Sequence, residues 1–239
     1  MIALSAQTRI VELRRYVMRP GRRDDLIAIF EREFIEGQEA CGMLPIGHYR
    51  DVDDDDAFVW FRGFESMETR RAALEAFYLN SDVWRINRDA ANETMIDSDN
   101  VLLLQPARAD RAFDLQGLSR PRSGDRSAHS FSGLAVLMLQ RPAQDAMIAV
   151  FEEKVLHRLD DLSTRVACYL TAPFENDFPR LPVREDEYAI VVSGVLSNLD
   201  DFANWTEVLQ PSNLPRELAS HVIATEYLRL HPAARSLLR

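Results

Sequence analysis

The stretch with the most unusual chemistry is the segment Ala57 to Phe64, AFVWFRGF. Its alternating pattern predicts a strand, with Phe58, Trp60, Arg62 and Phe64 on one face. A charge set among aromatic rings needs an ion-pair partner, water or a ligand, because an unpaired buried ion is costly. This face is therefore the first place to look for a binding site.

A second stretch, Arg9 to Met18, alternates in the same way and places Glu12, Arg14 and Tyr16 on one face. If the two stretches are strands one and three of a ferredoxin-like unit, they are neighbours and their polar faces join. We predict a ligand-binding wall with five members: Glu12, Arg14, Tyr16, Trp60 and Arg62.

We expect this wall to face the space between two half-sheets, while the apolar face with Val11 and Val59 meets the helices. The facing wall of the second half is small and apolar: Leu134, Val136, Met138, Ala189, Val191 and Ser193. Such asymmetry suits a pocket for an amphipathic or aromatic small molecule. In the alternative interpretation, Glu12 pairs with Arg14 or Arg62 and the lumen is a closed core.

Two residues are candidates for proton transfer, His48 and Tyr16. A buried imidazole can act as a general base near neutral pH. The strand that carries His48 is irregular, so its pattern does not fix the direction of the ring. In the alternative, His48 is an ordinary strand residue with a satisfied hydrogen bond.

We predict no metal site and no cofactor. No two histidines have the HxH or HxxxH spacing of metal ligands. The acidic run Asp51 to Asp56, DVDDDD, lacks the glycine and the distal glutamate of a calcium loop. It is better explained as a solvated turn between two strands.

The elements that position these residues follow from hydrophobic periodicity. The first half predicts a strand, a helix, two strands, a helix pair and a final strand, over residues 9–18, 24–34, 43–51, 57–64, 67–91 and 101–106. Ser66 has the position of an N-cap for the helix that starts at Met67. The order β-α-β-β-α-β is that of a ferredoxin-like unit.

The second half repeats this order. Arg141-Pro142 corresponds to Arg19-Pro20, and Ile148–Glu152 corresponds to Ile27–Glu31. We also align Gly194 and Ser197 with Gly63 and Ser66. Agreement of order and spacing indicates a tandem duplication.

We therefore predict an α+β fold of two ferredoxin-like repeats, residues 1–106 and a divergent 131–239, joined by a linker over 107–130. Each four-stranded sheet has helices on one face only and must cover the other. The two repeats can pack sheet to sheet within one chain, as an α/β barrel of the dimeric type. We expect the two-repeat chain to associate further as a homodimer.

Ten residues of the first half match a pattern that starts ELRxYxLxPG and continues with a Trp, Ser and Arg block and a further Trp: Glu12, Leu13, Arg14, Tyr16, Pro20, Gly21, Trp60, Ser66, Arg70 and Trp84. In these residues the first half resembles the NIPSNAP family. The resemblance implies a dimeric α/β barrel, often duplicated in tandem. It implies no reaction, because the biochemical role of the bacterial members is largely undefined. The wider superfamily includes cofactor-free monooxygenases, haem-dependent dismutases and peroxidases, isomerases and plain binding proteins.

The composition of the chain limits the classes of binding partner that we expect. The net charge of -10 argues against nucleic acid or an anionic membrane as a partner. The two cysteines, Cys41 and Cys168, form no disulfide framework, and no secretory or transmembrane segment is evident. We expect a cytoplasmic protein.

The sequence is compatible with three functions. The first is a NIPSNAP-like protein that binds a small amphipathic or aromatic molecule between the two half-sheets. The second is a cofactor-free monooxygenase or isomerase that acts on an aromatic or quinone-like substrate, with His48 or Tyr16 transferring the proton. The third is a non-catalytic interaction protein with a filled lumen.

Overall fold

The structure, a computed structural model, describes residues 8–122, 130–198 and 200–239. In the first half, the strands and helices follow in the order β1 (Ile10–Met18), α1 (Arg23–Ile29), η1 (Phe30–Phe34), α2 (Ile35–Ala40), β2 (Leu44–Asp51), β3 (Ala57–Phe64), α3 (Met67–Asn80), α4 (Asp82–Asn92) and β4 (Met95–Pro106).

After the short η2 (Ala109–Arg111), the second half gives the same order with shorter late helices. Its elements are β5 (Phe131–Leu139), α5 (Asp145–Phe151), η3 (Glu152–Leu156), α6 (His157–Asp160), β6 (Thr164–Thr171), β7 (Tyr188–Leu196), α7 (Asp200–Leu209), η4 (Pro211–Asn213), α8 (Arg216–Ala219) and β8 (Val222–Pro232).

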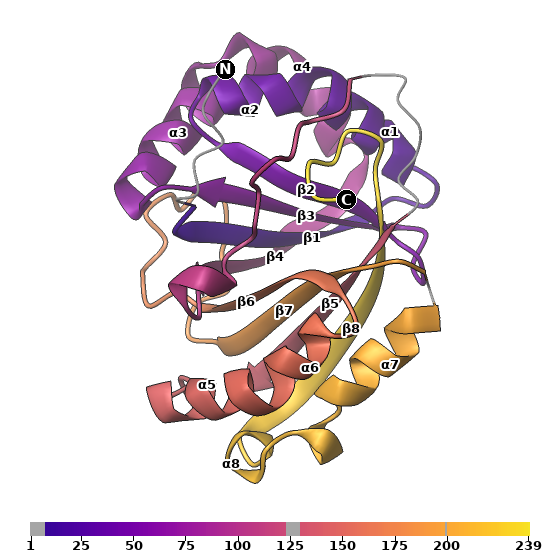
Figure 1. The fold of residues 1–239 in the computed structure, drawn as a ribbon. Coiled ribbons are helices and arrows are strands. Elements are labelled where there is room, and N and C mark those ends of the chain that lie inside the picture. Colours follow the sequence, from indigo (N-terminus) through magenta and orange to yellow (C-terminus); the bar gives the residue numbers. More distant parts are fainter. Residues whose placement is uncertain (1–7, 123–129, 199) are drawn as a thin grey trace.

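The eight strands close into one antiparallel barrel in the order β1-β3-β2-β8-β5-β7-β6-β4. Each half supplies four adjacent strands. Short ladders join the halves, between β2 and β8 and between β4 and β6. The helices of the two halves form layers on opposite sides of the barrel (Figure 1). This confirms the predicted fold of two ferredoxin-like repeats in one intrachain α/β barrel.

Apolar side chains from both halves fill the lumen, which is the interior of the barrel. The packed residues include Val11, Leu13, Val59, Phe61, Leu134, Val136, Ala189 and Val191. The expected orientation of the second half is therefore confirmed. That of the first half was wrong, because the face with Glu12 and Trp60 looks outward, toward helices α1 to α4.

The inversion has a physical reason. The interior of an eight-stranded barrel is only wide enough for side chains to fill it, so buried ions there would lack partners. On the helix side, by contrast, Arg70 and Tyr78 of α3 reach the charges of β1 and β3. The polar face is thus buried where hydrogen-bond partners exist.

The pairing of residues between neighbouring strands shows that part of the predicted alignment of the two repeats was wrong. Gly63 pairs with Val11 and faces the lumen, whereas Gly194 pairs with Gly133 on the helix side. The structural counterpart of Gly194 is therefore Arg62, which pairs with Glu12.

The two serines of the alignment also differ in role. Ser66 caps α3 as predicted, accepting from the N–H of Thr69 at 3.2 Å and donating its own N–H to Thr69 Oγ1 at 2.9 Å. In the second half the N–H of Asp201 donates to Asn198 Oδ1 at 3.0 Å, so the capping interaction lies one residue beyond Ser197.

Both halves share one unusual feature. The first helix of each half contains a single π-helical turn, η1 or η3, at the corresponding place. Since π-turns are rare, their recurrence supports the duplication.

The segment between the repeats packs against the barrel as far as it is described. Phe113 is buried, with its ring 5.1 Å from that of Phe61 and 5.0 Å from that of Tyr169. Arg120 donates to Glu39 at 2.8 Å. Residues 123–129 of the predicted linker lie outside the described residues.

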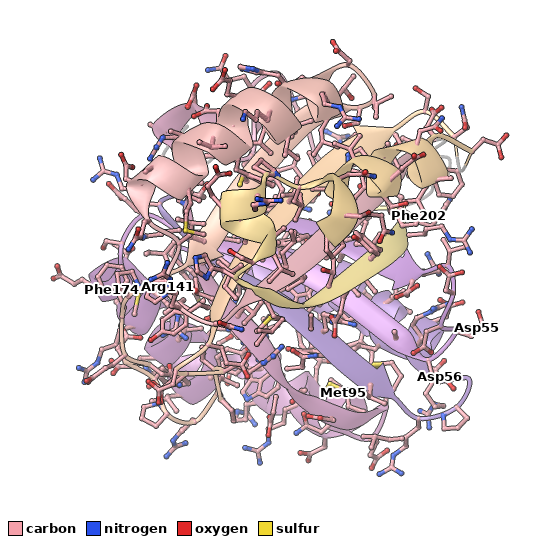
Figure 2. The ribbon with its side chains drawn as sticks, turned by 90° about the horizontal axis from the view of Figure 1, so that it is seen from below. Asp55, Asp56, Met95, Arg141, Phe174 and Phe202 are labelled. Carbon is pink, nitrogen blue, oxygen red and sulfur yellow. The ribbon has the colours of Figure 1, made fainter. Side chains whose placement is uncertain are left out.

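The acidic turn after β2 lies at the edge of the molecule, where Figure 2 shows Asp55 and Asp56. The Asp55 side chain is 99% exposed, and Asp53 forms an ion pair with Arg229 of β8. Residues 52–55 of the turn are exposed, as predicted, whereas Asp51 belongs to β2 and is buried. Among the described residues, no helix has both the length and the apolar character needed to cross a lipid bilayer.

Candidate functional site

The site is built around a carboxylate that is fully buried between the sheet and the helices. Glu12 on β1 accepts hydrogen bonds from three guanidinium groups. The donors are Arg14 Nη1 at 2.8 Å, Arg62 Nε at 2.7 Å and Arg70 Nε at 2.7 Å. Arg70 also pairs with Asp177, which comes from the loop between β6 and β7. We call these five residues the Glu12 network.

The network explains the ionisation of its carboxylate. Burial alone would raise the pKa of Glu12, but the charges of Arg62, Arg14 and Arg70 outweigh burial and hold that pKa well below its usual range. Glu12 is therefore an anion at any physiological pH. Since arginine does not deprotonate in proteins, the carboxylate of Glu12 is surrounded by three positive charges.

The second half shows that the fold does not require this network. Where Glu12 faces Arg62 across the ladder, the second half has Gly133 facing Gly194. The indole of Trp205 fills the space, so that a Cβ atom on either glycine would lie 3.1 Å from it. An apolar solution to the same packing problem thus exists in the same molecule.

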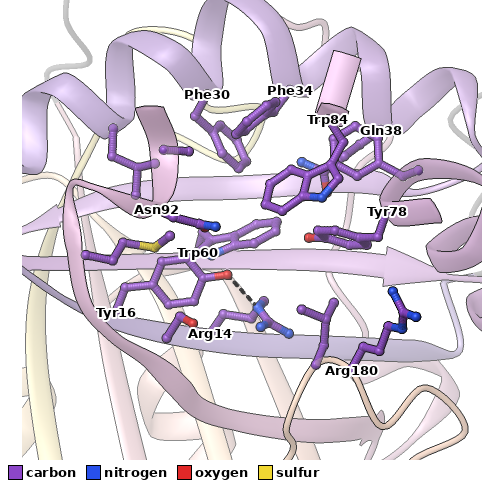
Figure 3. A pocket seen from close by; sticks show the side chains of 16 residues that line it. Arg14, Tyr16, Phe30, Phe34, Gln38, Trp60, Tyr78, Trp84, Asn92 and Arg180 are labelled. Carbon is purple, nitrogen blue, oxygen red and sulfur yellow. Dashed lines mark hydrogen bonds between the residues drawn. The ribbon is translucent and has the colours of Figure 1, made fainter. Parts of the chain in front are cut away.

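A pocket of about 270 Å³ lies beside the network, between the outward face of β1 and β3 and the helices of the first half. Figure 3 shows the pocket, with Trp60 in its centre. Its walls are largely aromatic. The lining residues are Arg14, Tyr16, Leu26, Phe30, Phe34, Gln38, Trp60, Phe77, Tyr78, Trp84, Ala91, Asn92, Met95, Ser98, Arg180 and Leu181.

Two phenols connect the network to the pocket. Tyr16 accepts from Arg14 Nε at 2.8 Å, and Tyr78 accepts from Arg62 Nη1 at 2.9 Å. An arginine N–H occupies a lone pair of each hydroxyl, which leaves the O–H free to donate. Burial raises the pKa of Tyr16 despite the opposing charge of Arg14, so this phenol stays protonated.

Two further polar atoms at the pocket have no partner. The indole Nε1 of Trp60 and the carboxamide Oε1 of Gln38 are buried and make no hydrogen bond to the protein. One is a donor and the other an acceptor. An unpaired buried polar group costs about 1–3 kcal/mol, so a ligand that hydrogen-bonds to either atom would be favoured.

The second half of the chain supplies one wall of the pocket. The loop between β6 and β7 crosses to the first half, where Phe178 is buried among the side chains of that core. Arg70 holds the loop through Asp177 and through Asn176 Oδ1 at 3.2 Å. Arg180 and Leu181 of the same loop then line the pocket.

His48 lies elsewhere. Its ring is buried against η1, with Nε2 3.0 Å from Glu31 Oε1 and the ring centroid 5.1 Å from that of Phe30. Desolvation lowers the pKa of His48 despite the nearby Glu31 carboxylate, so the imidazole is neutral and donates from Nε2. His48 is not among the residues that line the pocket.

The five predicted wall residues do lie together, although on the helix side. Arg14, Tyr16 and Trp60 reach the pocket, and Glu12 and Arg62 lie behind them in the network. Sequence reasoning missed Arg70, Tyr78, Trp84 and Arg180 as site residues. Arg70 and Trp84 did appear in the family pattern, which was the available signal. No local pattern marks Arg180, because it arrives from the other repeat.

Comparison with known proteins places the chain among barrel proteins. Residues 11–109 match the family model described as NIPSNAP. A protein from Fusobacterium nucleatum, named as a candidate monooxygenase, aligns at 9% identity and a TM-score of 0.57, covering 94% of this chain and 92% of that one. Chlorite dismutase from Candidatus Nitrospira defluvii aligns at 15% identity and a TM-score of 0.56, covering 96% and 93%.

A NIPSNAP-like domain protein from Burkholderia xenovorans aligns at 27% identity with a TM-score of 0.37, covering 42% of this chain and 86% of that one. No curated protein sequence matches the chain. At such identities the full-length alignments show the fold alone, because one fold can host many unrelated functions.

Proposed function

We propose that the protein, whose residues 11–109 match the NIPSNAP family model, binds a small amphipathic, largely aromatic molecule in the pocket of its first half. The ligand lies between the β1–β3 surface and the helices. We favour this position over the expected one between the two half-sheets, because buried apolar side chains from both halves pack together in the lumen.

The observation that carries the proposal is the pair of unpartnered polar atoms inside an aromatic pocket. Most buried polar side-chain atoms in proteins have a hydrogen-bond partner. Here Trp60 Nε1 and Gln38 Oε1 are buried, lack a protein partner and belong to residues that line one pocket. Aromatic walls with a few placed polar groups are typical of small-molecule sites.

Binding fits the pocket chemistry better than catalysis. The described residues that line the pocket include no histidine, cysteine or carboxylate. Tyr16 has a raised pKa, so it suits hydrogen-bond donation and is a poor base at neutral pH. The monooxygenase or isomerase alternative therefore lacks a base in the pocket, and the interaction-protein alternative leaves the pocket without a use.

The three tryptophans offer a direct test. Trp60 and Trp84 line the pocket, whereas Trp205 lies in the second half. In protein labelled with 5-fluorotryptophan, titration with 2-naphthol and with 2-naphthoate should shift the fluorine NMR signals of Trp60 and Trp84 and leave that of Trp205 in place. Single Trp-to-Phe variants assign the three signals.

A blocking variant and a neighbouring control sharpen this test. Ser98→Phe adds a ring to the pocket from β4, whereas Asp99→Phe adds the same ring at the next, exposed position. The shifts should disappear in Ser98→Phe and persist in Asp99→Phe. Absence of shifts with both probes, or equal shifts in the two variants, would contradict the proposal.

A further inference from the structure

We infer that the ligand of this pocket is an aromatic carboxylate, with its anionic group held by Arg14, Tyr16 and Tyr78. The inference rests on the proposed function and adds the chemical class of the ligand. It follows from the charge balance of the site, from the direction of its donors and from the ring faces that are already occupied.

The buried charges beside the pocket do not cancel. The Glu12 network has three guanidinium groups, of Arg14, Arg62 and Arg70, against two carboxylates, of Glu12 and Asp177. One positive charge therefore remains. Arg14 is the member of the network that also lines the pocket, and its side chain is only 1% exposed. A buried charge without a counter-charge is strongly unfavourable, so an anion in the pocket would complete the site.

The surroundings of the pocket increase this positive character. Arg180 lies at the pocket in an exposed position, and none of the ion pairs among the described residues involves it. No aspartate or glutamate is among the described lining residues. A cationic pocket within a chain of net charge -10 is a local feature, opposite in sign to the whole molecule.

The donors converge on one end of the pocket. Figure 3 shows Tyr16 and Tyr78 on opposite sides of the pocket, with their hydroxyls directed inward and the guanidinium of Arg14 between them. Both hydroxyls accept from arginines and so have an O–H to donate. A carboxylate has two oxygens that only accept, which matches a guanidinium flanked by two O–H donors.

The aromatic rings argue against a cationic ligand. Aromatic cages bind cations through their ring faces. Here Arg62 already lies 5.2 Å from the Trp60 ring centroid and 5.6 Å from that of Tyr78, and Arg14 lies 5.5 Å from that of Tyr16. The protein's own cations already lie near these three rings and would repel a second cation in the pocket.

The test compares an acid with its neutral isostere. By isothermal titration calorimetry, 2-naphthoate should bind at least about tenfold more tightly than 2-naphthamide to the full chain. Arg14→Met should abolish this preference, while the amide still binds. The variant leaves two guanidinium groups against two carboxylates, so its buried charges balance and we expect it to fold.

Arg15→Met is the matched control. Arg15 is the next residue on β1, points to the other face and pairs with Glu226 of β8, so its loss should leave the preference intact. Arg180→Met, at an exposed position, should reduce the preference about two- to fivefold and serves as the test if Arg14→Met does not fold. Equal affinity of acid and amide would overturn this inference and leave the proposed function standing. Absence of binding by either probe would overturn the proposed function itself.

Discussion

At the scale of single residues, the site depends on one carboxylate that holds three arginines together. Sequence alternation predicted which residues share a face with Glu12, because side-chain direction in a strand follows from a period of two. It could not predict the partners of Glu12, since Arg70 and Asp177 come from α3 and from the other repeat. The sequence also left the direction of His48 open, and the structure places that ring against Glu31.

Replacement of Glu12 should be far more costly than replacement of a surface glutamate. Glu12→Gln leaves three buried guanidinium groups without their central anion, and breaking a buried pair typically costs about 3–5 kcal/mol. We expect a loss of this size in the free energy of unfolding, measured by urea denaturation at pH 7. Glu75→Gln removes an exposed partner of Arg71 on α3 and should cost less than about 1 kcal/mol.

The pH dependence of the same two proteins provides a second measurement of this prediction. Because the pKa of Glu12 is lower in the folded protein than its ordinary value of 4.5, its stabilising contribution is fully present above pH 4.5. That contribution is lost as the pH falls toward the folded-state pKa. The stability of Glu12→Gln should therefore fall less steeply below pH 4.5 than that of the parent. Parallel curves, or a loss below about 1 kcal/mol at pH 7, would contradict the role given to Glu12.

At the scale of elements, the strands and helices could be predicted, but the burial of each strand face could not. Both faces of β1 and β3 are buried, one in the lumen and one under the helices, so polarity alone does not tell them apart. The direction of each face depends on where its polar side chains can find hydrogen-bond and ion-pair partners. The row of Val11, Leu13, Val59 and Phe61 fits an interior shared with an equally apolar second half. The row with Glu12 lies under the helices, because α3 supplies the side chains that bond to Glu12 and Arg62.

The loop between β6 and β7 belongs to the second repeat but packs against the core of the first. It extends from the second repeat to the first, and its backbone is fixed where the N–H of Arg184 donates to the Val101 carbonyl at 2.9 Å. The loop contributes both Asp177 to the network and Arg180 to the pocket. The site is therefore assembled from two repeats, which is a reason for the duplication to remain in one chain.

Loss of the loop's apolar anchor should open the pocket without unfolding the barrel. Phe178→Ala removes a buried ring from the first-half core, so the loop should detach and trypsin should cleave after Arg180 and Arg184 faster than in the parent. Affinity for 2-naphthoate should fall in parallel. Phe174→Ala, on the same loop but 47% exposed, should change neither quantity. Unchanged cleavage in Phe178→Ala would contradict the anchoring role given to Phe178.

At the scale of the whole molecule, the duplication explains why one chain forms a barrel that otherwise takes two. The predicted homodimer of the complete chain stays a prediction, to be checked by light scattering coupled to size-exclusion chromatography. Because the lumen face of each half is already covered by the other half, any such dimer must use an outer surface. The sequence could predict the pairing of two sheets, since each half had one uncovered face.

Separation of the halves tests whether the lumen is the main interface of the fold. A fragment of residues 1–122 would expose the apolar row of β1 and β3 together with the free edges of β2 and β4, which normally pair with β8 and β6. Exposed apolar faces and strand edges drive association. We expect this fragment to form a homodimer that completes an eight-stranded barrel, with twice the fragment mass by light scattering at micromolar concentration. A soluble monomer with native helical content would contradict this, because it would mean that the Glu12 network and the helix layer stabilise the first repeat without any cover for its lumen face.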